Sequence, residues 1–205
     1  MDYTKLADEA TLTKLVGALK ERNIEGIVVG SKEEALAKIK ELIPVGASVM
    51  NGSSTTLQEI GFVDYLKAGA HGWNNLHAVV LTEADPAKQA QLRKQAVLSD
   101  YYIGSVHALA QTGEAVIGSN SGSQLPHIAY TSPNVILVVG SQKITSTLTE
   151  AEARLKAHVI PLEDARMKSV GMGGTALNKL LYFFGEPTYT GRKIRIILVK
   201  EKLGF

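Results

Sequence analysis

The sequence predicts an α/β fold with an open, mostly parallel sheet and helices on both of its faces. Segments with helical spacing of apolar residues alternate along the chain with short apolar runs typical of buried strands. Gly or Pro stands at most of the junctions between them. The most hydrophobic run, residues 135–139, has the unbroken apolar character of a central parallel strand that is covered on both faces.

The first 70 residues predict three successive helices with strands between them. Apolar residues at helical spacing over 12–19 predict a helix that ends near Asn23, and the run at 27–29 predicts a strand. Ser31 followed by Glu34 is a capping-box pattern, so a second helix begins there and stops before Pro44. A strand at 48–50 then leads through a hydroxyl-rich turn to a helix over 57–70, broken once at Gly61.

The rest of the chain continues the alternation. A polar helix is expected from about residue 84 to 99, capped by Thr82 with Asp85. Further strands are expected at 101–104, 115–117, 135–139 and 194–199, a short crossover at 108–110, and helices at 125–130, 151–157 and 177–184. No linker, repeat or shift in composition interrupts these elements, so we expect a single domain over residues 1–205.

The composition excludes several classes of protein. The chain has 205 residues, with 22 basic and 20 acidic side chains and a net charge of +2, and the two signs are interleaved. Nucleic-acid binding therefore has no basic patch to rest on. No apolar run approaches the roughly 20 residues of a membrane span, and the N-terminus has no signal-peptide pattern, so we expect a cytoplasmic protein.

The chain has no cysteine, which excludes a thiol nucleophile, a disulfide and any thiolate-held zinc or iron-sulfur cluster within it. Its five histidines show none of the usual ligand spacings, so we expect no metal site. Residues 171–176 match the G-x-G-x-x-G/A dinucleotide fingerprint, but no strand precedes them and too little chain follows. We therefore reject that interpretation.

Three polar loops follow predicted strands, where ligands bind in open α/β sheets. The first loop consists of Gly52, Ser53, Ser54, Thr55 and Thr56. Two interpretations are open: its backbone amides and hydroxyls bind a phosphate or carboxylate, or its hydroxyls only cap a helix. The second lines the same cleft or is a plain surface connection; it contains Ser119, Asn120, Ser121, Gly122, Ser123 and Gln124. The third loop contains Lys143, for which three roles are open. It binds an anion, it acts as a base or nucleophile if it is desolvated, or it is an ordinary solvated lysine at the end of a strand.

Acid-base chemistry has three carboxylate candidates near strand ends, which are Glu59, Asp100 and Glu114. Their spacing does not say which of them, if any, acts as a base. The apolar run at 180–184 is either core or an oligomer contact.

Four segments, residues 52–61, 99–105, 111–114 and 135–144, together with the closing 201–205, resemble the LUD or lactate-utilisation domain family. This resemblance implies the fold of the ribose-phosphate isomerase, glucosamine-phosphate deaminase and coenzyme A transferase superfamily. It also implies the role of a cluster-free subunit in an iron-sulfur-dependent system that oxidises L-lactate to pyruvate. Redox clusters would then lie on partner subunits, and this chain would bind a small anionic metabolite.

Carried over residue by residue, the resemblance points to the first two loops described above and to Glu59, Asp100, Thr112, Gly113, Glu114 and Lys143 as ligand-binding or catalytic positions. We also expect Gln142, next to Lys143, to bind the ligand. Ser123 and Gln124 stand where longer relatives have an Asn-Arg pair, so the bidentate contact of an arginine with an anion is missing there.

Three hypotheses follow from the sequence. The first is the lactate-oxidation subunit. The second is a free-standing isomerase-like or transferase-like enzyme that acts on a phosphorylated sugar or a CoA ester. In it Glu59 or Glu114 is the base, and Lys143 and the Ser/Thr loop at 52–56 hold the anion. The third is a non-catalytic ligand-binding module.

Overall fold

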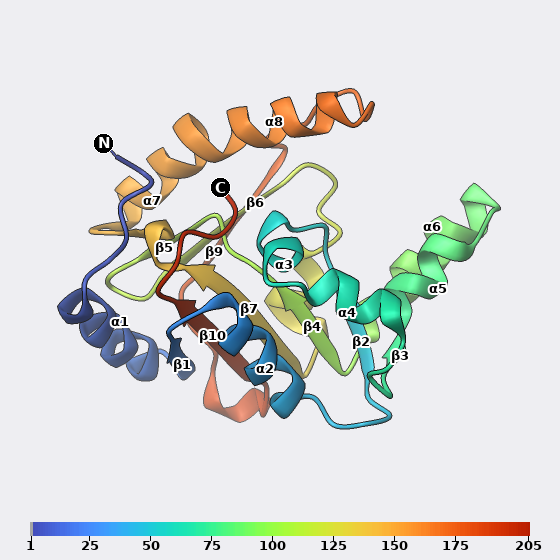
Figure 1. Cartoon of the computed structure of the whole chain (residues 1–205), viewed down its shortest axis with the longest axis horizontal. Helices are drawn as coiled ribbons and strands as arrows, with labels where there is room; N and C mark the ends of the chain where they lie inside the picture. The colour runs from blue at the N-terminus through green and yellow to red at the C-terminus, as the bar shows by residue number, and fades with distance from the viewer. Residues whose placement is uncertain (1) are drawn as a thin grey trace.

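A six-stranded parallel sheet forms the centre of the protein, as a computed structural model describes it for residues 2–205 (Figure 1). Its strand order is β1-β10-β7-β4-β2-β3. The bounds are β1 (Ile24–Val29), β10 (Lys193–Val199), β7 (Asn134–Gly140), β4 (Tyr101–Gly104), β2 (Ser48–Asn51) and β3 (Asn74–Asn75). The predicted α/β class is confirmed, and the run at 135–139 is a central strand, paired with β10 on one side and β4 on the other.

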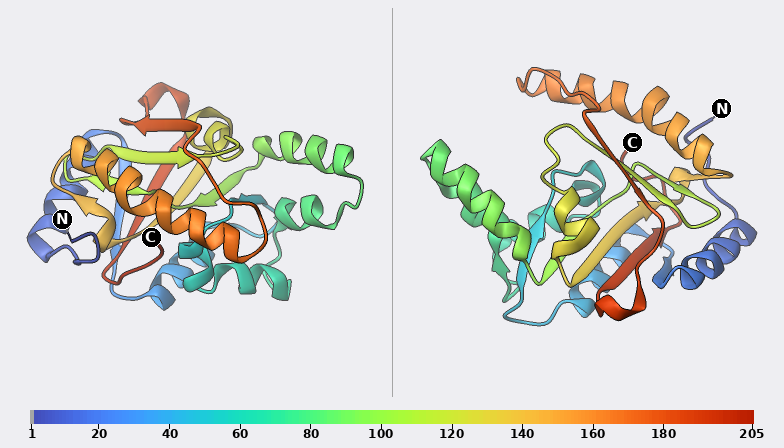
Figure 2. Two further views of the ribbon diagram at one scale, coloured as in Figure 1. Left: turned by 90° about the horizontal axis from the view of Figure 1, so that it is seen from above. Right: turned by 180° about the vertical axis from the view of Figure 1, so that it is seen from behind.

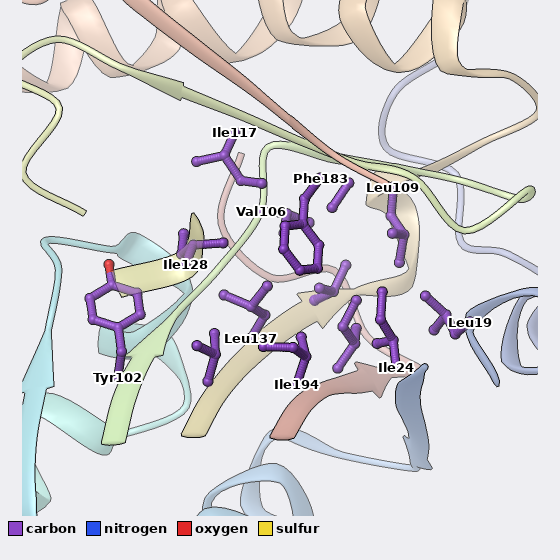
Figure 3. Close-up of a cluster of buried hydrophobic side chains, with 14 of the residues drawn as sticks. Leu19, Ile24, Tyr102, Val106, Leu109, Ile117, Ile128, Leu137, Phe183 and Ile194 are labelled. Carbon is purple, nitrogen blue, oxygen red and sulfur yellow. The ribbon is translucent and has the colours of Figure 1, made fainter. Parts of the chain in front are cut away.

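Alternate residues of β7 enter two different cores, because successive side chains of a strand point to opposite faces. Val138 packs with α2 (Lys32–Leu42), α3 (Thr55–Glu59) and α4 (Phe62–Ala68). Leu137 packs on the opposite face with Leu19 of α1 (Glu9–Glu21) and with Leu109 and Phe183 of a second sheet (Figure 3).

The second sheet has four strands in the order β8-β5-β6-β9. Its bounds are β8 (Ile144–Thr145), β5 (Ala108–Ala110), β6 (Ala115–Ser119) and β9 (Lys179–Phe183). One face packs on the parallel sheet, and the other packs on α7 (Leu148–Arg154) and the π-helical turn Leu155–Val159 that joins it to α8 (Ile160–Ser169). The small sheet thus lies between the parallel sheet and the long helical segment, as the two views in Figure 2 show.

Local signals placed several elements correctly. The Ser31 hydroxyl accepts a hydrogen bond from the Glu34 amide and begins α2. Gly61, with φ of 76°, separates α3 from α4, because a residue with a side chain rarely adopts this left-handed conformation.

Two predicted elements are wrong because strand pairing overrides local preference. Residues 108–110 form β5 rather than a crossover, since β5 and β6 make an antiparallel hairpin. Residues 177–184 contain β9 rather than a helix, since Lys179–Phe183 pairs with β6 along its whole length. Short apolar runs fit a buried helix or a strand equally well, so the sequence alone did not separate them.

The predicted polar helix at 84–99 is also corrected at its start. Its cap is Asp85, which accepts hydrogen bonds from the amides of Ala87 and Lys88 at the start of α6 (Pro86–Gln95). Thr82 instead ends α5 (Leu76–Thr82), a helix that the sequence analysis did not predict. Helices α5 and α6 form a pair that extends away from the sheets (Figure 1). Within residues 2–205, no helix combines the length and apolar character of a membrane span.

Candidate functional site

A cleft of about 430 Å³ opens at the carboxyl ends of β2, β4, β6 and β7. Its walls are the turn at 52–56, the segment at 104–107, the loop at 118–124, Lys143, and parts of α8 and the segment that follows it. Ligands of open α/β proteins bind at this edge of the sheet, because the strand ends and the following turns converge there. All three polar loops that follow strands in the sequence contribute to this one cleft.

The turn at 52–56 has a structural and a cleft-facing part. The Ser54 hydroxyl accepts from the Leu57 amide and caps α3, as the capping interpretation predicts. Gly52 passes so close to the Tyr102 side chain that a Cβ atom there would lie 2.7 Å from the phenol oxygen. Gly52 and Tyr102 line the cleft, as do Ser53, Thr55 and Thr56.

Lys143 is the central charged group of the cleft wall. It is 3% exposed, and its ammonium donates to Thr56 Oγ1 at 2.9 Å, Ser105 Oγ at 3.1 Å and the Val106 carbonyl at 3.3 Å. All three acceptors are neutral, and no carboxylate of residues 2–205 lies within 4.0 Å of the amine. Burial, followed by the nearby Arg154 charge, lowers the pKa of Lys143 to about 7, while Glu59 acts in the opposite direction.

Arg154 adds a second buried cation behind Lys143. Its Nη1 donates to the carbonyl oxygen of His107 at 2.5 Å and to a main-chain oxygen of Phe205 at 3.2 Å. Its Nε and Nη2 atoms are buried and have no partner within residues 2–205. Arg154 does not itself line the cleft, so it acts on Lys143 through its positive charge.

His107 completes this wall as a neutral ring. Its Nδ1 accepts from the Gly118 amide at 3.1 Å, so the proton of the neutral ring lies on Nε2. Burial, with the charges of Lys143 and Arg154, lowers the pKa of His107 to about 3. The ring stays uncharged at neutral pH and offers the cleft an N–H donor.

The loop after β6 is held by its own hydrogen bonds. Ser119 Oγ donates to Gln124 Oε1 at 3.1 Å and accepts from the Gly122 amide at 2.9 Å. The Gln124 amide donates to the Gly118 carbonyl at 3.2 Å. Within this predicted loop, the residues that line the cleft are Ser119, Asn120, Ser121, Ser123 and Gln124, whereas Gly122 packs toward Lys179.

Four residues predicted at the site lie elsewhere. Asp100 is at the amino end of β4, where it accepts from the Ser48 amide at 2.8 Å and the Ser48 hydroxyl at 2.6 Å, and these bonds lower its pKa. Glu114 forms an ion pair with Arg22 beside the turn between β5 and β6, and the same arginine donates to the Thr112 carbonyl at 2.7 Å. Gly113 lies in that turn, close to the Arg22 side chain. None of the four lines the cleft.

Glu59 and Gln142 lie beside the cleft and hold the segment at 201–205 over Lys143. Glu59 accepts from the Gly204 amide at 2.6 Å, and Gln142 donates to the Leu203 carbonyl at 2.8 Å. Gly204 has φ of 62°, and a Cβ on it would lie 3.2 Å from Lys143 Nζ. The two side chains therefore position the backbone that encloses the amine.

The sequence analysis did not predict Ser105 and His107, which line the cleft, or Arg154, which acts on Lys143 through its charge. The sequence does carry a signal for Ser105 and His107, because the apolar Val106 stands between them. In an extended segment alternate side chains point to opposite sides, so when Val106 enters the core, both of its neighbours face the cleft. Arg154 stands in an ordinary helical segment, and α8 likewise gave no sign in the sequence that it borders the cleft.

Comparison with known proteins gives one family and one similar fold. The family profile described as the LUD domain matches residues 12–175. The crystal structure of a DUF162 family protein from Deinococcus radiodurans is similar with a TM-score of 0.58 and 14% identity, over 95% of this chain and 99% of that one. At this identity the likeness concerns the fold alone. No curated protein matches the sequence significantly.

Proposed function

The chain belongs to the LUD domain family, and we propose that it binds a small anionic metabolite of the carboxylate class in the cleft at the strand ends. The observation that carries this proposal is the environment of Lys143. Its ammonium is buried against three neutral acceptors, and the nearby Arg154 adds a second positive charge. Buried charges in proteins are normally paired, so a bound anion would supply the missing negative charge.

The remaining walls suit a small polar ligand. Hydroxyl groups of Ser53, Thr55 and Ser121 line the cleft and can donate hydrogen bonds to carboxylate oxygens. The volume of about 430 Å³ lies in the lower part of the usual range for small-molecule sites. A metabolite with one carboxylate and a few further polar atoms fits this description better than a dinucleotide.

The wider role that we propose is that of the cluster-free subunit of an iron-sulfur-dependent L-lactate oxidation system. The resemblance described above supports this role. The residues of this chain do not fit a cluster themselves, because iron-sulfur clusters are held mainly by cysteine thiolates and the chain has no cysteine. Electron transfer would therefore take place on partner chains, while this chain holds the small acid.

The isomerase-like hypothesis has less support from the geometry. Its two candidate bases are engaged outside the cleft, Glu59 with the Gly204 amide and Glu114 with Arg22. The carboxylate that does line the cleft, Glu163, is bound in a two-pronged contact by Arg166.

Ligand binding is the direct test. We expect L-lactate or pyruvate to raise the melting temperature of the purified chain, since ligand at 100 times its Kd stabilises a protein by about 2.7 kcal/mol. Phosphate, a sugar phosphate and coenzyme A serve as competing classes of anion. Lys143→Met should weaken binding at least about tenfold, whereas Lys67→Met, whose side chain is 74% exposed on α4, should not. Absence of binding by every carboxylate would contradict the proposal.

The subunit role needs its own experiment. The tagged chain is isolated without oxygen from the cells that encode it, and the eluate is analysed for iron, acid-labile sulfide and partner chains. We expect cysteine-rich chains that carry clusters, and lactate-dependent reduction of those clusters. A chain that elutes alone and leaves lactate oxidation unaffected when its gene is deleted would contradict this role.

A further inference from the structure

Lys143 shares its amine between two hydroxyl groups that differ in access to the cleft. Thr56 borders the cleft but is only 1% exposed, so its hydroxyl is almost closed to solvent. Ser105 is partly exposed and lines the cleft, with its Oγ atom 3.1 Å from the Lys143 amine. One hydroxyl is thus both in contact with a lysine amine and within reach of a ligand.

We propose that Ser105 and Lys143 form a serine–lysine nucleophile pair, and that the cleft accepts small carboxylic esters or thioesters that acylate Ser105. This goes beyond the binding function proposed above and does not rest on it. A serine hydroxyl is a weak nucleophile until an adjacent base removes its proton, and a lysine amine performs this task in one known variant of the catalytic triad.

The fold fixes both members of the pair. Ser105 directly follows β4, and Val106 anchors this segment in the core beneath the small sheet (Figure 3). Lys143 lies in the 3-10 turn that directly follows β7, the neighbouring strand of the same sheet. Two adjacent parallel strands therefore deliver the nucleophile and its base to the same edge.

The environment also favours the uncharged amine that a base requires. The charged and titratable groups that act on Lys143 are Arg154 from α7, Glu59 from α3 and His107 from the segment after β4. His107 is neutral, so the positive charge of Arg154 and burial oppose protonation of Lys143, and Glu59 offsets them only in part. With a pKa of about 7, roughly half of the amine is uncharged at neutral pH.

His107 supplies the third element of an acyl-transfer site. Ser105 and His107 are two residues apart on an extended segment, so their side chains point to the same side, and both line the cleft. The Nε2–H group of the neutral ring is a donor for the negative charge that develops on the carbonyl oxygen.

The chemistry balances without a cofactor. Ser105 Oγ forms a bond to the carbonyl carbon while its proton moves to Lys143 Nζ. The tetrahedral intermediate then breaks the bond to the leaving oxygen or sulfur, which takes the proton from Lys143, and acyl-Ser105 remains. Water, activated by Lys143 in the same way, releases the acid and restores the hydroxyl, so ester and water become acid and alcohol.

The experiment uses p-nitrophenyl acetate as an activated ester, with intact-mass measurement and peptide mapping of the acylated protein. We expect one acetyl group on Ser105 and a rate that rises with pH to a plateau, with a midpoint near pH 7 set by Lys143. Ser105→Ala and Lys143→Met should each lower the acylation rate at least about 100-fold. Ser169→Ala, an exposed serine at the end of α8, and Lys67→Met are the matched controls.

Because the chain has no cysteine, Ser105→Cys introduces a single thiol and gives a second measurement that needs no turnover. We expect iodoacetamide to alkylate this thiol with a pKa below the usual value near 8.5, and the addition of Lys143→Met to raise that pKa. Acetyl groups found only on other residues, or a thiol pKa that ignores Lys143, would overturn the proposal.

The two proposals fail in different ways. Ser105→Ala should abolish acylation and retain carboxylate binding, because the Lys143 ammonium is still present. If the unmodified chain is acylated on Ser105 but binds no carboxylate, the binding function alone is refuted. Binding without acylation of Ser105 would refute the nucleophile pair alone.

Discussion

Arg192 and Lys143 are buried cations at opposite edges of the parallel sheet, and their surroundings differ. At the amino edge, directly before β10, Arg192 forms an ion pair with Glu186 at 2.7 Å, and the two side chains are 7% and 3% exposed. The same guanidinium donates to backbone carbonyls, including those of His127 at 2.9 Å and Ser132 at 3.0 Å. At the carboxyl edge, Lys143 is equally buried but meets only neutral oxygens.

The difference separates a structural charge from one that is available to a ligand. Arg192 forms an ion pair and several further hydrogen bonds inside the protein, and its planar fork suits these fixed acceptors. Lys143 pays a similar desolvation cost without a carboxylate partner, beside a cleft that a ligand can enter. The protein thus retains an unbalanced lysine at the edge where strand ends and polar loops converge. Such unbalanced sites are typical of functional positions.

The largest expected effect is on the stability of the amino edge. Arg192→Met leaves the Glu186 carboxylate buried without its partner, so we expect a loss of about 3–5 kcal/mol in the free energy of unfolding. Urea denaturation measures this change. Lys193→Met, next to it and exposed, is the control and should change stability by less than about 0.5 kcal/mol. A similarly small loss in Arg192→Met would remove the contrast between the two edges.

Replacement of Lys143 by Met should change how stability depends on pH, because burial of this amine disfavours its charged form. The pKa of Lys143 is about 7 in the folded protein against an ordinary 10.5, so the unfolded chain binds more protons between these values. The native protein consequently gains stability as the pH rises through this window, and Lys143→Met removes that gain. We expect the stability of the unmodified protein relative to Lys143→Met to rise by about 2 kcal/mol between pH 7 and pH 9. Urea denaturation at the two pH values measures it, and a constant difference would show that Lys143 keeps its ordinary pKa.

The sequence predicted those elements of the fold that neighbouring residues specify, and it failed for elements that depend on pairing between distant segments. Caps and periodicity placed α1, α2 and β7, because each of these elements is specified by a few neighbouring residues. The segment that contains β9 was misread as a helix, because its pairing with β6 joins strands some 60 residues apart in the chain. All strands of the parallel sheet except β3 were predicted, whereas in the small sheet only β6 was.

The candidate site follows the same division. The polar loop after β2 and the lysine after β7 were predictable as neighbours, since parallel strands end at one edge. The loop after β6 reaches the same cleft from the small sheet, where β6 pairs antiparallel with β5 and β9. Glu114 could not be told apart from these residues, because its partner Arg22 directly follows α1 and no spacing rule connects the two. The pairing of Ser105 with Lys143 likewise depends on the adjacency of β4 and β7, which only the strand order reveals.

Opposite pH profiles at the carboxyl edge sharpen the comparison further. An anion binds the ammonium form of Lys143, whereas acylation of Ser105 needs the uncharged amine. With a pKa of about 7, the charged fraction falls from about 0.9 at pH 6 to about 0.1 at pH 8, so carboxylate affinity should fall nearly tenfold. Acylation by p-nitrophenyl acetate should rise over the same range. Calorimetry and stopped-flow absorbance measure the two profiles, and a saturating carboxylate should suppress acylation. Parallel profiles would mean that one of the two reactions does not involve Lys143.

The smallest expected effect concerns Glu59, whose charge favours the protonated form of Lys143. Glu59→Gln keeps an oxygen that accepts from the Gly204 amide and removes only the charge, so the enclosing segment should stay in place. We expect the midpoint of both pH profiles to move about half a unit toward acid, because a carboxylate outside direct contact acts on the amine only through partly screened attraction. Glu114→Gln, beside Arg22 and away from the cleft, should leave the midpoint unchanged. A shift toward alkali in Glu59→Gln would show that Glu59 acts by positioning the segment at 201–205 and not by its charge, and the two buried cations would then differ in packing as well as in pairing.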